Sequence, residues 1–229
     1  SRTILKVDIA EKEGIFNFKN TYASPQRIIQ ITANSADKII EIINENLNLI
    51  YSTMYLNEIQ EKQRRISKNL NQTQAIKNST GLTLRFPSAY RVAKVDSNFV
   101  WIRRDIETGS INLFISRYND KNHSSIVKIR DSISKHHIPG PVENTFMSTD
   151  LIYTPSSQQI SVRGKQILET RGLWEIKGQF MAGPFLNYQF ESNTKQDEYI
   201  MLDGFVYSPG SSKREYVFEL EAIMRSLKN

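Results

Sequence analysis

A long stretch without helix-breaking residues is the feature that most constrains the fold of this 229-residue chain. Neither glycine nor proline occurs from residue 36 to residue 77. Apolar residues recur there at spacings of three, four and seven, as they do on one face of an α-helix. Residues 34–37 supply short polar side chains that cap a helix N-terminus. The stretch therefore predicts one long helix, or two helices joined near residues 51–53.

The chain changes character after Gly81, where short strands alternate with turn residues. Residues 99–102 and 111–115 flank a turn-forming run at 107–110, which predicts a β-hairpin. Consecutive strands without helical crossovers favour antiparallel pairing. The same pattern predicts further strands at residues 82–86, 145–153, 158–163, 167–177, 185–191 and 199–207.

Two more helices are expected in this part of the chain. Residues 124–137 carry apolar side chains at helical spacing and stop before Pro139, and residues 213–228 repeat the pattern at the C-terminus. The predicted fold class is α+β: a helix-rich N-terminal part, then a mainly antiparallel sheet covered by helices in an α-β-α sandwich.

The polar run at residues 69–80 predicts a linker between two domains. We therefore expect a first region at residues 1–80, in which strands at residues 1–34 precede the long helix. The α-β-α domain is expected at residues 81–229.

Composition excludes several classes of function. The chain has no cysteine, which rules out disulfides, thiolate nucleophiles and iron–sulfur clusters. Its apolar runs are much shorter than the roughly 20 residues that span a bilayer. The net charge is +6, and the chain has one local basic cluster, at residues 62–68. Because nucleic-acid binding needs a broader basic patch, we do not expect nucleic acid as the partner.

The sequence contains no motif for phosphate binding, nucleophilic catalysis or metalloprotease chemistry. Adjacent His136 and His137 would point about 100° apart on a helix, which disfavours a shared metal ion. His123 is the third histidine. Four carboxylates, Asp105, Glu107, Glu175 and Asp203, are scattered along the chain. No catalytic residue, metal or cofactor is predicted, and a non-enzymatic protein is favoured.

Residues 171–174, 180–185 and 203–210 combine aromatic side chains with glycine or proline. Glycine beside an aromatic residue permits a bulge or a close backbone approach. One interpretation is a binding surface, and the other is an aromatic core with turn residues. The candidate binding residues are Arg171, Trp174, Phe185 and Tyr207.

Trp174 is expected to be largely buried. Strand alternation places Arg171 and Trp174 on opposite faces of a regular strand. Arg171 would join the aromatic residues only if Gly172 formed a bulge.

Several short runs along the chain are specific in their order and spacing. They are Arg130-Asp131-Ser132-Ile133, Ile138-Pro139-Gly140-Pro141, Arg171-Gly172-Leu173-Trp174, Met181-Ala182-Gly183-Pro184-Phe185, Asp203-Gly204-Phe205-Val206-Tyr207 and Lys213-Arg214. These runs resemble a lipoprotein family of unknown function from the Bacteroidota, over most of the chain. The resemblance implies a signal peptide and a lipid-modified cysteine upstream of Ser1. It also implies an envelope protein as partner and a location on the periplasmic side of the cell envelope, where the lipid anchor alone contacts the membrane.

The order of elements after Gly81 also looks like the PsbP/Mog1-type sandwich, a fold that mostly serves binding and assembly. The leading hypothesis is a non-enzymatic envelope lipoprotein that binds a protein or assists envelope assembly. One alternative is an envelope protein that binds or hydrolyses a glycan or lipid. The other is a cytoplasmic polyanion-binding protein.

Overall fold

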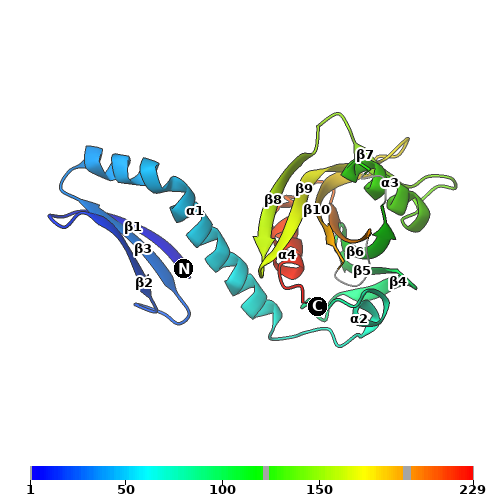
Figure 1. The fold of residues 1–229 in the computed structure, drawn as a ribbon, viewed down its shortest axis with the longest axis horizontal. Helices are drawn as coiled ribbons and strands as arrows, with labels where there is room; N and C mark the ends of the chain where they lie inside the picture. The colour runs from blue at the N-terminus through cyan, green and yellow to red at the C-terminus, as the bar shows by residue number, and fades with distance from the viewer. Residues whose placement is uncertain (1, 121–123, 193–196, 229) are drawn as a thin grey trace. The chain divides into compact units, whose positions relative to one another are not determined.

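The computed structural model describes residues 2–120, 124–192 and 197–228. This described part contains two sheets and four helices, so the expected α+β class is confirmed. The chain forms two compact units, Ser1–Arg65 and Ile66–Asn229, and each has its own sheet (Figure 1).

The first unit begins with a small sheet. Strands β1 (Thr3–Ile9), β2 (Gly14–Lys19) and β3 (Arg27–Ala33) lie in the order β1-β3-β2. β1 is parallel to β3, whereas β2 is antiparallel to it. Helix α1 (Ala36–Ile66) then lies along the sheet (Figure 1). The part expected to be helix-rich is therefore better described as a three-stranded sheet with one long helix.

The central strand β3 and helix α1 form the core of this unit. Ile29, Ile31 and Ala33 share one face of β3 because they are two residues apart. They pack against Ile39, Ile42 and Ile50 of α1 in one cluster. The helix runs through residues 51–53 without a break.

The boundary between the units differs from the expected one. α1 ends at Ile66, and much of the expected linker belongs to the second unit. Helix α2 (Ala75–Thr80) buries Ile76 and Thr80, and Gly81 ends it in a left-handed conformation with a φ of 76°. The division therefore falls between Arg65 and Ile66. The sequence places it later because a short polar helix has the same composition as a flexible linker.

The second unit contains an eight-stranded sheet in which every pairing is antiparallel, as the sequence predicts. Its order is β4-β5-β6-β11-β10-β9-β7, and β8 also pairs with β9. The predicted hairpin is formed by β5 and β6, which meet at Ile106 and Gly109. The strands are β4 (Arg91–Asp96), β5 (Phe99–Ile106), β6 (Gly109–Asn119), β7 (Met147–Asp150), β8 (Ser156–Val162), β9 (Lys165–Ile176), β10 (Ala182–Glu191) and β11 (Glu198–Tyr207).

The alternating run at residues 82–86 does not join this sheet. Leu82, Leu84 and Phe86 are buried, so the alternation does mark one inward face. The backbone at Thr83 pairs instead with Lys228 near the end of the chain, through hydrogen bonds of 2.8 and 2.9 Å. Alternation predicts a strand at residues 82–86 because it reports which side chains are buried. It does not report which segment the backbone pairs with.

Helices α3 (Ile126–His137) and α4 (Arg214–Met224) contact opposite faces of the large sheet. α3 reaches Asp203 of β11 through Arg130, whereas Leu220 of α4 lies against Gly204. Adjacent residues of a strand point to opposite faces. Each helix meets only part of the sheet, since α4 contacts β6, β10 and β11 while α3 lies beside β7. The helices therefore do not clearly cover the sheet as the expected α-β-α sandwich requires.

Gly183 and Pro184 stand where β10 diverges from β11. The ladder between these strands begins only at Phe185, so Pro184 removes no hydrogen bond from it. A Cβ atom at Gly183 would lie 2.0 Å from the carbonyl oxygen of Val206 and 3.1 Å from the indole nitrogen of Trp174. Glycine is thus required at position 183, where the backbone lies close to both the Val206 carbonyl and the Trp174 indole.

We predict that Gly183→Ala destabilises the second unit more than Gly204→Ala does. The first substitution places a Cβ 2.0 Å from a backbone carbonyl oxygen, whereas the second meets Leu220 at 3.2 Å, a contact that a shift of a few tenths of an ångström relieves. Overpacking that forces backbone shifts costs about 1–3 kcal/mol. Urea unfolding followed by tryptophan fluorescence measures the difference, and equal midpoints for the two variants would contradict it.

Candidate protein-binding site

The structure brings together three of the four predicted site residues. Trp174, Phe185 and Tyr207 lie on the face of the sheet that α3 contacts, within one aromatic cluster or packed against it. Arg171 lies on the opposite face, where its Nη2 donates to Glu221 of α4 at 2.8 Å. Gly172 remains in regular register with Phe185, so no bulge turns Arg171 toward the aromatic residues.

Trp174 is a core residue with 2% of its surface exposed. Its indole nitrogen donates to the Val206 carbonyl at 3.2 Å, which satisfies the one polar group of the ring. The Phe205 ring packs edge-on at 5.6 Å, and the Tyr207 ring lies 6.3 Å away. The expected burial of Trp174 is confirmed, and its surroundings are those of packing.

Replacing Trp174 with alanine should lower the free energy of unfolding by about 3–5 kcal/mol, because the change leaves a large cavity in the core. Phe180→Ala is the matched control, since Phe180 is fully exposed in the turn after β9. We expect it to change stability by less than about 0.5 kcal/mol. A Trp174→Ala protein with an unchanged urea midpoint in circular dichroism would exclude a core role.

A buried ion pair that the sequence did not reveal lies beside this cluster. Arg130 of α3 donates from Nε and Nη2 to the two carboxylate oxygens of Asp203, at 2.8 and 3.2 Å. Nη1 donates to Thr149, and the guanidinium stacks 3.9 Å from the Phe185 ring centroid. Asn187 donates to the same Asp203 carboxylate at 2.8 Å. These bonds fix α3 on the sheet and leave neither charge open to a substrate.

A second polar cluster joins the opposite face to α4. Arg171 bridges Glu169 and Glu221, while Arg225 donates to Glu221 at 2.9 Å. Glu169 faces Tyr188 directly across strands β9 and β10. Burial raises the pKa of Tyr188 well above its usual value, so the phenol stays protonated. The carboxylates are neutralised by arginines, which suits a structural role better than acid–base catalysis.

Another of the four carboxylates noted in the sequence, Asp105, is held in ion pairs. Asp105 forms ion pairs with Arg91 and Arg103 at 3.2 and 2.6 Å. Within residues 2–120, 124–192 and 197–228, no group of three or more His, Asp or Glu side chains could hold a metal ion. His123 lies outside the described residues.

His137 ends α3 against β4 and β5. Its ring stacks on Phe99 at 3.8 Å, and its Nδ1 lies 3.3 Å from both Lys94 Nζ and Asp96 Oδ2. His136 packs edge-on against it at 4.6 Å. Burial, helped by Lys94 and His136, lowers the pKa of His137 below its usual value of 6.5.

The lowered pKa predicts a stability change in mild acid. The unfolded chain binds a proton near pH 6.5, whereas folded His137 binds one only at lower pH. This contribution to stability is fully present above about pH 6.5 and is lost as the pH falls toward the folded pKa. Urea midpoints between about pH 7.5 and 5.5 should fall less for His137→Gln than for the natural chain. Parallel curves would contradict this linkage.

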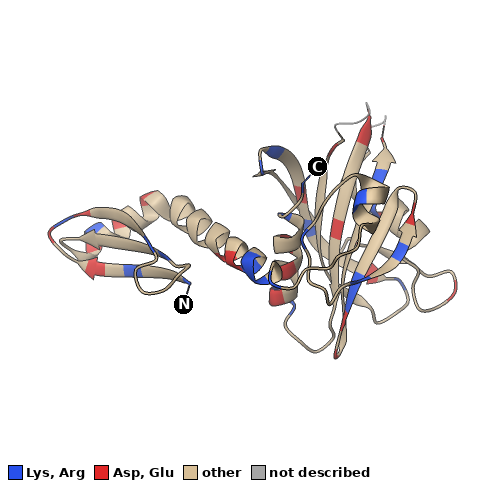
Figure 2. Ribbon diagram, turned by 90° about the horizontal axis from the view of Figure 1, so that it is seen from below, with Lys and Arg blue, Asp and Glu red and all other residues tan. Residues whose placement is uncertain are grey.

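The basic cluster at residues 62–68 is partly neutralised by an acid. Arg64 and Arg65 donate to Glu61 at 2.6 and 2.8 Å, and the hydrogen bond from Arg64 is the main cause that lowers the Glu61 pKa to about 2. Figure 2 shows basic and acidic residues interspersed in both units. This distribution does not favour a polyanion surface.

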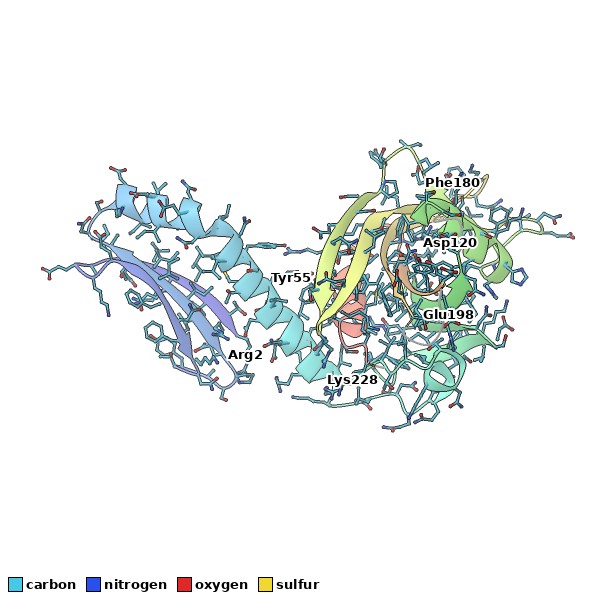
Figure 3. The ribbon with its side chains drawn as sticks, in the orientation of Figure 1. Arg2, Tyr55, Asp120, Phe180, Glu198 and Lys228 are labelled. Atoms are coloured by element: carbon cyan, nitrogen blue, oxygen red, sulfur yellow. The ribbon has the colours of Figure 1, made fainter. Side chains whose placement is uncertain are left out.

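Two hollows of the described part of the chain are shallow. The larger, of about 460 Å³, lies where β6 ends and β11 begins, beside the turn between β4 and β5. Arg117 and Glu198 line it and form an ion pair at 2.7 Å (Glu198 is labelled in Figure 3). The smaller, of about 220 Å³, lies between α1 and the segment at Pro25. Neither has the apolar enclosure typical of a small-molecule site.

Exposed apolar side chains are concentrated in the first unit. Sixteen large apolar residues are exposed in the described part of the chain, and ten of them belong to Ser1–Arg65. Six lie on β1 and on one side of α1, with exposed fractions from 42% to 69%. We call these six residues the β1 flank: Leu5, Val7, Ile9, Ile40, Leu47 and Tyr51.

The six residues share one side of the unit. Leu5, Val7 and Ile9 are register partners of Ile29, Ile31 and Ala33, so they point toward the α1 side of the sheet. Glu58 of α1 contacts Thr3 of β1, which identifies the side of the helix that faces β1. Ile40, Leu47 and Tyr51 lie about five, three and two whole turns before Glu58, and therefore on that side.

The fold and these contacts define a mixed α+β protein whose described buried charges serve packing and whose first unit exposes an apolar surface. Residues 69–226 match a family described as Domain of unknown function (DUF4837), and the chain belongs to this family. Residues 1–67 match a Domain of unknown function (DUF8532). The two matches meet beside the boundary between the units. No curated protein matches the chain.

Proposed function

We propose that this protein is a non-enzymatic protein-binding factor, and that it binds its partner through the β1 flank. The observation that carries the proposal is the set of six large apolar side chains exposed together on β1 and α1. Soluble proteins rarely expose contiguous apolar surface unless it serves an interaction.

The buried charges support binding over catalysis. Arg130 occupies both oxygens of Asp203, and arginines bracket Glu169 and Glu221. A general acid or base needs a group that can exchange a proton with a substrate. The groups in the large sheet are instead held in ion pairs that join helices to strands.

We further propose that the protein acts in the cell envelope as a lipoprotein anchored on the periplasmic side. The basis is the resemblance of its short runs to a Bacteroidota lipoprotein family, and the partner would then be an envelope protein. Among the described residues, no helix is both long and apolar enough to cross a membrane. The likeness to PsbP/Mog1-type sandwiches agrees with contacts of α3 and α4 on opposite faces of the sheet, and that fold mostly serves binding and assembly.

Photo-cross-linking in the native organism tests the proposal. A benzophenone amino acid replaces Leu47 or Val7 in the full-length protein, and Glu45 is the control because it is exposed on the other side of α1. We expect protein adducts in the membrane fraction from positions 47 and 7, and far fewer from position 45. Equal labelling at the three positions would refute the β1 flank as the site, and recovery in the cytosolic fraction would refute the envelope location.

A further inference from the structure

We propose that β1 pairs with β1 of a second copy of this chain, in an antiparallel arrangement centred on Val7. The inference rests on the proposed function, since it names the partner of the β1 flank. In the described part of the chain, β1 has β3 on one side and no strand on the other. Its seven residues include no glycine or proline that would interrupt a new ladder.

The backbone of β1 shows which residues face the open edge. Ala10 donates its N–H to Ala33 at 2.9 Å, and the Arg2 carbonyl accepts from Arg27 at 2.9 Å. Even-numbered residues of β1 therefore bond to β3, and odd-numbered residues direct their N–H and C=O groups outward. The outward residues include Leu5, Val7 and Ile9, whose side chains are also exposed. An edge of this kind is a template for strand addition.

Charge selects the register of the pair. With Val7 at the two-fold axis, Lys6 of each chain lies opposite Asp8 of the other, and Leu5 lies opposite Ile9. Lys6 and Asp8 already form an ion pair 3.0 Å apart within each chain, and 49% and 37% of their side-chain surfaces remain exposed, so each can also face the opposite charge of the second copy. Opposite charges across an antiparallel pair are stabilising, and like charges are destabilising.

Neighbouring registers lack this match. Moving the axis two residues back, to Leu5, places Lys6 opposite the apolar Ile4. Moving it two residues forward, to Ile9, places Lys6 opposite Lys12. The axis at Val7 also makes Val7 and its symmetry mate a hydrogen-bonded pair, as their outward backbone groups require.

The same arrangement accounts for the apolar side chains. Leu5, Val7 and Ile9 of both chains would meet on one face of a continuous six-stranded sheet, between two α1 helices. Leu47 and Tyr51 border that face on each side. A symmetric interface of this type is self-complementary, so one apolar strand suffices to form it.

Charge reversal provides the test, with the full chain examined by analytical ultracentrifugation. Lys6→Asp and Asp8→Lys each place like charges opposite one another, so each protein alone should dimerise at least about tenfold more weakly than the natural chain. An equimolar mixture of the two variants restores opposite charges and should form heterodimers. The double variant Lys6→Asp/Asp8→Lys should also dimerise. Recovery in the mixture would show that each single variant is still folded.

A proline substitution tests the backbone ladder separately. Val7→Pro removes an N–H that points outward, a position where edge strands tolerate proline. Val7→Thr keeps that N–H and is the matched control. We expect a monomer for Val7→Pro and a dimer for Val7→Thr, with unchanged circular dichroism in both.

Two outcomes would overturn the inference: a natural chain that stays monomeric at about 100 μM, where even weak interfaces associate, or a dimer indifferent to every substitution. A monomer that still cross-links to another protein from position 47 would refute the second copy while leaving the proposed function intact. Loss of cross-linking as well would refute both.

Discussion

The second unit depends on an ion pair from which water is excluded. Arg130 is 1% exposed and Asp203 is fully buried, so each charge requires the other to offset its lost hydration. The two bonds between them set both the rotation and the height of α3 over the sheet. Thr149 and Phe185 are positioned by the same guanidinium, which links strands β7 and β10 to the helix. A buried pair of this kind favours one arrangement strongly, because leaving either partner alone costs about 3–5 kcal/mol.

The sequence predicts best those elements whose formation is local. The helix of residues 36–66, the hairpin of β5 and β6, and strands β7 to β11 follow from apolar periodicity and turn residues, because burial acts on each segment separately. The sequence predicts an element poorly where the structure depends on which distant segment the backbone pairs with. Residues 82–86 alternate like a strand but pair with the end of the chain. In strand β4, Val95 is exposed and Lys94 is half-buried, so its apolar residues do not mark one buried face.

The candidate site shows a similar limit. Alternation along β9 correctly separates Arg171 from Trp174, since a strand without a bulge leaves no other choice. The Arg130–Asp203 pair joins residues that are distant in sequence, and no pattern of spacing reports such a contact. The β1 flank had a signal, because Ile40 and Tyr51 do not fit the core stripe of α1. Sequence could not show whether another element covers them, and only the fold reveals that they are exposed.

The aromatic cluster of the second unit holds both tryptophans of the chain, so the two units can be distinguished by spectroscopy. Both tryptophans, Trp101 and Trp174, contact the same ring of Phe205, at 6.4 and 5.6 Å. The first unit contains tyrosines but no tryptophan. Light absorbed by indole alone therefore reports only on the large sheet, whereas far-ultraviolet circular dichroism also senses the 31 residues of α1. Because the chain lacks cysteine, a single introduced thiol would carry a dye at one chosen place. The melting of each unit can thus be followed in one intact molecule.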